Sequence, residues 1–213
     1  MNNWLSKITN DNSQKEYYLT DIVTLAKKDN TKIVTHEAKN ESTISGINSK
    51  AELIAMEKIM KQTKIEKLVE QGVTIIDPSR TEIRGSLVCG LDVEIDVGCI
   101  FEGEVKLGNN VKVGAYSHVI DSNIVNNSNI KHYSHIDTTE IGIYNNVGTY
   151  ARLSPGAKTK NNVNIGNFVE IKNSILGSGT KINHLSYVGD SEEGDNVNIR
   201  AGCLKLIWVG VDK

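Results

Sequence analysis

A six-residue repeat of apolar residues is the feature that most constrains the fold of this chain. The repeat begins near residue 83, and it fits neither the helical period of about 3.6 residues nor the strand period of about 2. Its steps are shortened to five residues at several places, and Thr159 interrupts it. The apolar positions are Ile95, Phe101, Leu107, Val113, Val119, Ile124, Ile130, Ile136, Ile141, Val147, Leu153, Ile165, Ile171, Leu176, Ile182, Val188 and Ile199. A hexapeptide repeat predicts a parallel β-helix.

Three hexapeptides complete one triangular coil of 18 residues, or 17 where a step is shortened. Successive coils are then expected to stack at the strand spacing of about 4.8 Å. The composition agrees with such a fold, because the chain has 25 Ile and 23 Asn but only 5% aromatic residues. Aliphatic side chains fill a narrow interior, and Asn and Gly suit tight corners that need left-handed backbone angles. Residues at the same offset from the apolar position should therefore form columns on the surface.

The chain before the repeat is predicted to contain two helices and a small mixed α/β piece. Thr20 is a candidate N-cap for a helix over residues 21–26. Ser49 and Glu52 have the spacing of a capping box, which predicts a second helix that ends at Gly72. Its buried stripe is predicted to consist of Leu53, Met56, Met60, Ile65, Leu68 and Val69. Its lysines, Lys58, Lys61, Lys64 and Lys67, are interpreted as a solvated face.

The charge balance excludes some classes of partner. The chain has 24 Lys and Arg against 26 Asp and Glu, so there is no electrostatic reason to expect binding to nucleic acid or to a membrane surface. No apolar run approaches the roughly 20 residues that span a bilayer, and the N-terminus does not look like a secretory signal. Three cysteines without metal-type spacing are expected to be reduced thiols. We therefore expect a cytoplasmic protein.

Two surface columns carry residues that suit a reaction: Ser154 with Lys172 one position after the apolar residue, and Asn167, His184 and Ala201 two positions after it. An imidazole is a common general base at neutral pH, and a lysine can neutralise a phosphate. Tyr187 adds a hydrogen-bond donor in the coil of His184. Taken alone, His184 is more often a surface residue than a base, so the spacing leaves both interpretations open.

A rival cluster contains three histidines. His118 and His135 lie one 17-residue coil apart, just before the apolar position, and His132 is near them in sequence. Stacked histidines can hold zinc, but a closed zinc site needs a third or fourth ligand. The more ordinary interpretation, a pair of surface histidines, is favoured.

Seven strings in the chain resemble one protein family. They are EYYLTD at 16–21, GIN at 46–48, DVEID at 92–96, ARLSPG at 151–156, GNFVEIK at 166–172, HLSYVGD at 184–190 and GDNVNI at 194–199. Together they resemble the bacterial bifunctional N-acetylglucosamine-1-phosphate uridyltransferase and glucosamine-1-phosphate acetyltransferase, in the family's order, from about residue 4 to about residue 202.

The resemblance implies a domain organisation and two activities. It implies that residues 1–48 are the remnant of an α/β uridyltransferase domain, 49–72 a linker helix and 73–213 an incomplete left-handed β-helix acetyltransferase domain. The β-helix domain of the family acetylates glucosamine 1-phosphate with acetyl-CoA. Its N-terminal domain then joins the product to UTP with Mg²⁺, which yields UDP-N-acetylglucosamine for peptidoglycan and lipopolysaccharide. The family also implies a homotrimer.

The resemblance also implies roles for individual residues. His184 would be the base that accepts a proton from the attacking amine, and Lys172 would hold the sugar phosphate. Tyr187 and Asn198 would position the sugar, and Ala201 would contact acetyl-CoA. Asn48 matches an asparagine that helps to bind Mg²⁺ in the uridyltransferase site.

The chain departs from the family at several of these places. Ser154 stands where the family has an arginine, which reduces a two-cation phosphate clamp to one cation and costs about 1.5 to 3 kcal/mol of binding. Arg200 replaces a glycine, and residues 204–209 stand where the family has Asn-Tyr cofactor contacts. Met1 begins inside the uridyltransferase domain, so Asn48 lacks its acidic metal partner and Mg²⁺ is not expected to bind. We expect weak or absent acetyl transfer and no uridyltransferase activity.

Three hypotheses follow from the sequence. The first is an acetyltransferase that keeps the residues on the sugar side and has an altered acetyl-CoA site. The second is a non-catalytic β-helix that survives as a trimerising remnant of the bifunctional enzyme. The third, an acyltransferase of another hexapeptide family, is disfavoured by the family-specific strings.

Overall fold

The computed structural model describes residues 2–38 and 40–205. Contacts divide the chain into two units, one up to Asn48 and one from Ser49 onward. The first unit contains three short helices: α1 (Asn2–Leu5), α2 (Asp21–Lys28) and the 3₁₀ helix η1 (Glu41–Thr43). None of the helices among the described residues combines the length and the apolarity needed to cross a membrane.

The helix expected after Thr20 is present as α2, but the cap predicted for it is wrong. Thr20 already has helical angles, with φ of −62° and ψ of −21°, and its side chain makes no capping hydrogen bond. A capping residue needs an extended backbone to turn its hydroxyl toward the first free N–H groups. A side-chain hydrogen bond connects α1 to the C-terminal end of α2: the indole N–H of Trp4 donates to Asp29 Oδ2 at 2.7 Å.

The second unit opens with α3 (Lys50–Glu70), and the predicted capping box is confirmed. Ser49 Oγ accepts from the Glu52 N–H at 3.2 Å, and Glu52 Oε2 accepts from the Ser49 N–H at 3.1 Å. After the helix, Gly72 has a φ of +92°, a left-handed angle that glycine adopts without strain.

The apolar stripe predicted for α3 is correct only near its C-terminal end. Ile65 and Leu68 are buried there, but Leu53, Met60 and Val69 are 43%, 57% and 49% exposed. The helix packs on strand β2 (Glu82–Cys89), and few other elements are near it. The first coil of the β-helix covers only part of this 21-residue helix, so the other apolar residues of the helix remain exposed to solvent.

Two of the α3 lysines bind the β-helix and do not form a purely solvated face. Lys61 Nζ donates to the Ser79 carbonyl at 3.1 Å and to Glu82 Oε1 at 2.8 Å. Lys64 Nζ donates to the Gly85 carbonyl at 2.8 Å. β2 pairs only with β4, so its other edge is free, and Lys64 satisfies a backbone acceptor there, whereas Lys61 binds the Glu82 side chain and a carbonyl that precedes β2.

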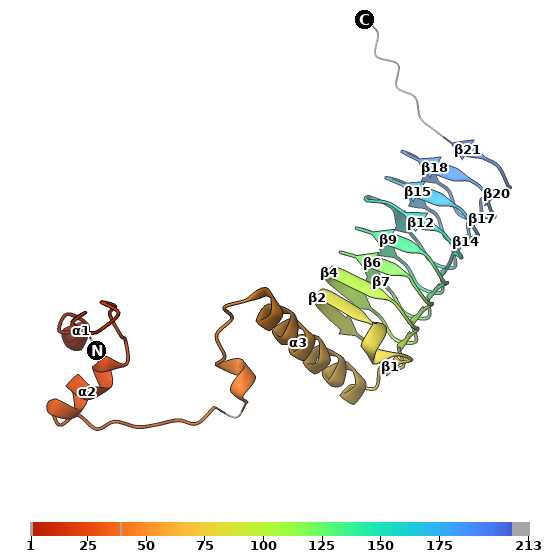
Figure 1. Cartoon of the computed structure of the whole chain (residues 1–213). Helices are drawn as coiled ribbons and strands as arrows, with labels where there is room; N and C mark the ends of the chain where they lie inside the picture. The colour runs from red at the N-terminus through yellow and green to blue at the C-terminus, as the bar shows by residue number, and fades with distance from the viewer. Residues whose placement is uncertain (1, 39, 206–213) are drawn as a thin grey trace, which may run out of the picture. The chain divides into compact units, whose positions relative to one another are not determined.

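The rest of the unit is the predicted fold, a left-handed parallel β-helix with three faces (Figure 1). Face 1 consists of β1 (Thr74–Ile75), β3 (Glu94–Ile95), β5 (Lys112–Val113), β8 (Asn129–Ile130), β11 (Asn146–Val147), β14 (Asn164–Ile165), β17 (Lys181–Ile182) and β20 (Asn198–Ile199). The 3₁₀ helix η2 (Pro78–Arg80) follows β1. The strands of each face are paired in parallel.

Two longer strands, β2 and β4 (Ile100–Leu107), turn a corner and belong to both other faces. Face 2 continues from them through β6 (His118–Ile120), β9 (His135–Asp137), β12 (Arg152–Leu153), β15 (Glu170–Lys172), β18 (Tyr187–Gly189) and β21 (Leu204–Lys205). Face 3 continues through β7 (Asn123–Ile124), β10 (Glu140–Ile141), β13 (Lys158–Thr159), β16 (Ile175–Leu176) and β19 (Glu192–Glu193). The order of the strands is therefore that of coils wound one after another.

The register confirms the repeat. Leu153 is paired with Ile171, an 18-residue coil, and Ile182 is paired with Ile199, a 17-residue coil. The apolar residues of the repeat point inward and are buried. Thr159 occupies an inward position as well, and its Oγ1 accepts from Asn145 Nδ2 at 2.6 Å. The interruption is thus a buried hydroxyl with a hydrogen-bond partner, which limits its cost.

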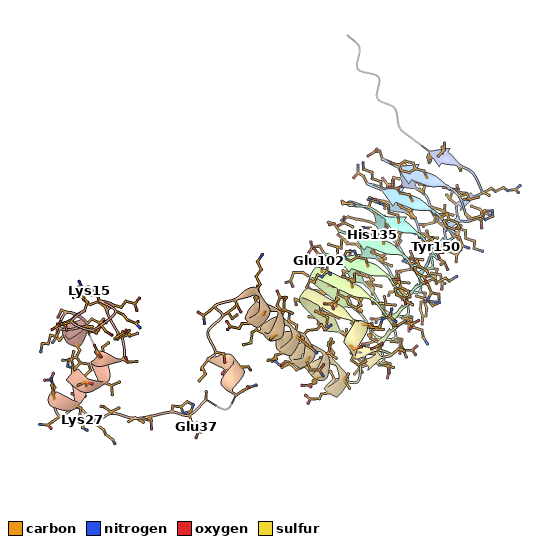
Figure 2. The ribbon with its side chains drawn as sticks, in the orientation of Figure 1. Lys15, Lys27, Glu37, Glu102, His135 and Tyr150 are labelled. Atoms are coloured by element: carbon orange, nitrogen blue, oxygen red, sulfur yellow. The ribbon has the colours of Figure 1, made fainter. Side chains whose placement is uncertain are left out.

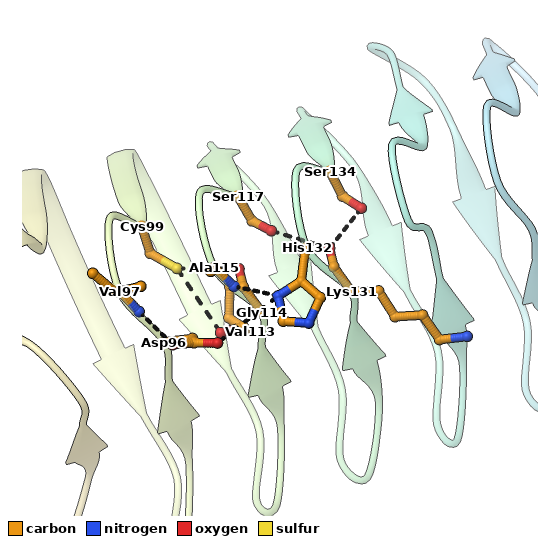
Figure 3. A network of polar contacts seen from close by, with 10 residues as sticks. All are labelled: Asp96, Val97, Cys99, Val113, Gly114, Ala115, Ser117, Lys131, His132 and Ser134. Atoms are coloured by element: carbon orange, nitrogen blue, oxygen red, sulfur yellow. Dashed lines mark hydrogen bonds and ion pairs between the residues drawn. The ribbon is translucent and has the colours of Figure 1, made fainter.

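Side-chain hydrogen bonds to the backbone tie the coils together at the corner between faces 1 and 2 (Figure 3). Ser117 Oγ and Ser134 Oγ both donate to the Lys131 carbonyl, at 3.1 Å and 2.8 Å. His132 Nδ1 accepts from the Ala115 N–H at 3.0 Å. Short polar side chains therefore satisfy backbone groups where the chain turns and the strand ladder is interrupted.

A ladder of aromatic rings runs along the outside of this corner. Tyr116, Tyr133, Tyr150 and Phe168 stack at centroid distances of 5.2, 4.9 and 5.1 Å. Tyr150 is labelled in Figure 2. All four residues have φ between +54° and +58°, left-handed angles that were expected at these corners only for Asn and Gly. Ring stacking between coils offsets part of the backbone cost.

The inward column ends in a pair of charges. Glu193 occupies the inward position after Leu176 on face 3, and Lys205 occupies the one after Val188 on face 2. Lys205 Nζ binds Glu193 Oε1, and the exposed fractions of the two side chains are 42% and 6%. An ion pair thus takes two inward positions at the end of the described β-helix, whereas Ile199 keeps an aliphatic side chain on face 1.

Candidate functional site

The residues that the resemblance singles out fall into two groups in the β-helix. Lys172, Tyr187 and Ser154 lie along face 2. His184, Asn198 and Ala201 lie at the corner between faces 1 and 2 or on face 1 beside it. His184 and Tyr187 are in the same coil, on the two sides of the corner's turn. The structure therefore brings the two groups to one edge of the β-helix without joining them in one enclosed pocket.

The corner column predicted from the spacing is confirmed. The Leu185 N–H donates to the Asn167 carbonyl at 3.0 Å, and the Gly202 N–H donates to the His184 carbonyl at 3.3 Å. These bonds place Asn167, His184 and Ala201 in three successive coils. His184 and Ala201 are both exposed, so the imidazole is open to a ligand that lies along the edge.

A shallow hollow of about 500 Å³ lies beside His184 on the face 1 side of the corner. Phe168, Leu185 and Asn183 line it together with His184, and Lys131 reaches it from three coils before His184. Asn183 Nδ2 donates to Asn198 Oδ1 at 3.1 Å. Asn198 is therefore connected to the hollow through Asn183, although it is not itself part of the lining.

On face 2, Lys172 is paired in register with Gly189, and both flank the inward-pointing ladder of Ile171 and Val188. Tyr187 is one strand position before Val188, and its ring lies against Gly189. Lys172 is exposed and Tyr187 is half-buried. An ammonium group and a phenol thus share one patch of face 2, an arrangement suited to an anionic oxygen-rich ligand.

Ser154, in contrast, is engaged within the protein. It is only 5% exposed, and its Oγ accepts from Arg152 Nε at 3.2 Å and donates to Glu170 Oε1 at 3.4 Å. Arg152 Nε also lies 3.6 Å from Glu170 Oε1. Ser154 is next to Lys172 by register, as predicted, but its hydroxyl serves this network. Arg152 and Glu170 are not among the site residues expected from the sequence, although strand alternation alone places both on the outer surface, next to the inward-facing Leu153 and Ile171.

The three-histidine cluster does not form a metal site. Among the residues that the structure describes, no group of three or more His, Cys, Asp or Glu side chains is arranged to hold a metal ion. The rings of His118 and His135 meet edge to face at 5.2 Å, and His132 uses Nδ1 to accept a backbone N–H. Figure 2 labels His135 and Glu102; the Glu102 carboxylate lies 3.4 Å from His118 Nε2. Burial, and then the charge of His118, lower the pKa of His135.

Neither of the two cysteines with a shifted pKa is suited to be a nucleophile. Burial raises the pKa of the Cys99 thiol to about 11 and raises that of Cys89 even further. A thiol is nucleophilic mainly as the thiolate, so both groups are protonated and unreactive at neutral pH.

Asn48 lies at the end of the first unit and is exposed. The nearest acidic residue after it, Glu52, uses its carboxylate in the capping box of α3. An asparagine without a set of carboxylates does not fit the ligand requirements of Mg²⁺, and no group of three or more His, Cys, Asp or Glu among the described residues could hold a metal ion. Of the segment 204–209 that replaces the family's cofactor contacts, only Leu204 and Lys205 lie within the described residues.

These features define the class of the protein: it is a hexapeptide-repeat, left-handed parallel β-helix protein with an exposed histidine beside a hollow at one corner. No protein-family model matches the chain. Among solved structures, the UDP-N-acetylglucosamine acyltransferase of Francisella novicida aligns with 55% of this chain and 60% of its own, at 14% identity and a TM-score of 0.39. A perosamine N-acetyltransferase from Caulobacter crescentus aligns with 65% and 61%, at 13% identity and a TM-score of 0.28.

Curated relatives are much more similar in sequence. The bifunctional protein GlmU of Nitrosospira multiformis is 46% identical over all 213 residues, which cover 46% of its length. That of an Azoarcus species is 45% identical over 210 residues, 99% of this chain and 46% of its own. The chain is thus a relative of the bifunctional GlmU proteins and spans about half of their length. The resemblance predicted from the sequence strings is confirmed.

Proposed function

We propose that the chain transfers an acetyl group from acetyl-CoA to the amine of glucosamine 1-phosphate. The observation that carries the proposal is the position of His184, which is exposed beside the hollow, with Ala201 at the equivalent place in the next coil. In a relative of the bifunctional GlmU proteins, these are the positions that match the family's base and its acetyl-CoA contact. The backbones of His184 and Ala201 are one coil apart, a spacing of about 4.8 Å, so acetyl-CoA bound at Ala201 would lie beside the imidazole.

The reaction that fits this arrangement is direct transfer. The lone pair of the sugar amine attacks the thioester carbonyl carbon, a C–N bond forms, and the C–S bond breaks to release CoA as the thiol. His184 accepts the proton that the amine nitrogen loses and returns it to the departing sulfur. A positioned imidazole is well suited to both transfers near neutral pH.

The sugar would be held from both sides of the corner. Lys172 would pair with the phosphate, and the Tyr187 hydroxyl would add a hydrogen bond on face 2. Asn198, joined to the hollow through Asn183, would hold the sugar on face 1. Within one chain, Lys172 and Tyr187 lie on face 2 and Asn198 lies on face 1, on the other side of the corner. This separation fits the expectation that several copies of the chain complete the site together, as a homotrimer. The trimer and the cytoplasmic location stay predictions.

Release of CoA tests the proposed function directly. The purified chain is mixed with acetyl-CoA and glucosamine 1-phosphate, and free thiol is measured with a colorimetric reagent. We expect slow thiol release, because the acetyl-CoA side is altered; it should depend on glucosamine 1-phosphate and stop when N-acetylglucosamine 1-phosphate is supplied instead, because that sugar has no free amine. Thiol release that is the same without sugar would count against transfer.

The second candidate is a non-catalytic β-helix that assembles with other copies. The altered acetyl-CoA side favours it, because Arg200 replaces a glycine next to Ala201 and Lys205 is used in an ion pair inside the coil. Absence of any sugar-dependent thiol release, together with a trimer in sedimentation experiments, would support this candidate over the enzyme.

Substituting Ser154 with arginine is expected to tighten the binding of glucosamine 1-phosphate about tenfold, because it adds a second cation beside Lys172. Calorimetric titration measures the effect. The matched control is Ser154→Met, which has a similar size and no charge and should not tighten binding. If both variants bind alike, the phosphate does not lie between residues 154 and 172.

A further inference from the structure

Gly189 ends β18, and a neighbouring ring occupies the space that its side chain would take. A Cβ atom added at Gly189 would lie 2.6 Å from Cε1 and 2.6 Å from the hydroxyl oxygen of Tyr187, and 2.9 Å from its Cζ. These are the three nearest atoms, and contacts under 3.0 Å are not tolerated between real side chains. The phenol of Tyr187 therefore lies directly over Gly189.

The backbone does not require glycine at this position. Gly189 is not among the residues with positive φ, so its backbone conformation suits other amino acids. Equivalent positions of earlier coils on face 2 carry side chains, as Lys172 and Asp137 show. The fold thus accepts a side chain at this position, and the atoms nearest to a Cβ at residue 189 belong to the Tyr187 ring.

The absence of a side chain at residue 189 leaves the space that the phenol occupies. Tyr187 and Gly189 lie on either side of Val188 along β18, and both positions face outward. The ring leans across β18 from the column that contains Glu170 toward the column that contains Lys172. Lys172 is the register partner of Gly189, so the hydroxyl oxygen over Gly189 lies in the column of Lys172, one coil away from that residue.

We propose that Gly189 is a positioning residue that holds the Tyr187 hydroxyl beside the Lys172 ammonium group, so that both bind the phosphate end of the substrate. The inference rests on the proposed function, in which Lys172 and Tyr187 bind glucosamine 1-phosphate. Its new content is that residue 189 sets the affinity through the direction of the Tyr187 side chain, without touching the substrate.

The test is calorimetric titration of the full chain and its variants with glucosamine 1-phosphate and, separately, with acetyl-CoA. We expect Gly189→Ala to weaken binding of the sugar phosphate about tenfold, as Tyr187→Phe does, because each removes one hydrogen bond to a charged group. The double variant should bind no more weakly than Tyr187→Phe alone, since the hydroxyl is already absent. The affinity for acetyl-CoA should not change in any of them.

Gly194→Ala is the matched control, because a Cβ there would meet only Val197 Cγ2, at 4.0 Å. It should bind both ligands as the unmodified chain does. Unchanged sugar affinity in Gly189→Ala, or losses that add in the double variant, would overturn the role of Gly189 while leaving the proposed function intact. Equal losses for acetyl-CoA and the sugar phosphate would reveal a general structural defect and also overturn it. If the unmodified chain binds no glucosamine 1-phosphate, the proposed function fails and this inference fails with it.

Discussion

Replacing His184 with alanine is expected to lower the rate of sugar-dependent CoA release about 100-fold to 10,000-fold, the usual contribution of a positioned general base. The imidazole is exposed at the corner, and its backbone carbonyl keeps the hydrogen bond from Gly202 whatever the side chain is. The β-helix should therefore remain folded. Initial rates at saturating acetyl-CoA, with thermal unfolding recorded in parallel, measure the effect on chemistry apart from stability.

The matched control is His36→Ala, which removes an exposed histidine from the first unit. It should leave the rate unchanged. A loss of less than about threefold in His184→Ala, in a chain that does release CoA, would mean that the amine loses its proton to water or to another group, and the role assigned to His184 would be wrong.

Replacing Lys205 with alanine is expected to destabilise the last described coil by about 3 kcal/mol, because it leaves a buried carboxylate without its partner. Each coil contacts only its neighbours, so the coil can open without unfolding the rest. The measurement is hydrogen exchange of the Tyr187 N–H, which is bonded to the Cys203 carbonyl at 2.9 Å. Its protection should fall by about 100-fold.

A double variant separates the charge from the packing. Glu193→Leu with Lys205→Met replaces the ion pair by apolar groups, and Leu176 already fills the equivalent position one coil earlier. Such replacements are commonly neutral or stabilising, so protection of the Tyr187 N–H should return to its original value or exceed it. Lys181→Ala, at an exposed position of β17, is the control for loss of a lysine. Equal protection in all four proteins would show that the pair carries no energy.

The fold could be predicted from the sequence because its determinant is a strict period. The series from Ile95 to Ile199 fixed the fold class, the register and the column that joins His184 to Ala201. Which residues of α3 are buried could not be predicted from the sequence. Leu53 and Met60 lie on the apolar stripe of the helix, but they are exposed because the first coil does not extend far enough to cover them. The periodicity of a helix shows which of its faces is apolar, but it does not show how much of that face another element covers.

The site was predictable only at the level of columns. Spacing placed Ser154 beside Lys172, but the hydrogen bonds of Ser154 to Arg152 and Glu170 depend on side-chain rotamers. In the same way, Tyr187 and Gly189 are ordinary residues in sequence, and only coordinates show the ring over the glycine. The left-handed angles of Tyr116 and Phe168 were also missed, because their cost is offset by stacking between residues that are 17 or 18 positions apart.

The strand order shows how the coils follow one another. Each strand of face 1 pairs with the equivalent strand of the next coil, from β1 through to β20, and none crosses to another face. Each coil thus lies over the one before it in the same register. Insertion or loss of a whole coil would shift residues along the axis and leave each of them on its own face, so binding groups on either side of it would stay on the faces they occupy. In such a molecule, length can vary while the assignment of residues to faces is conserved.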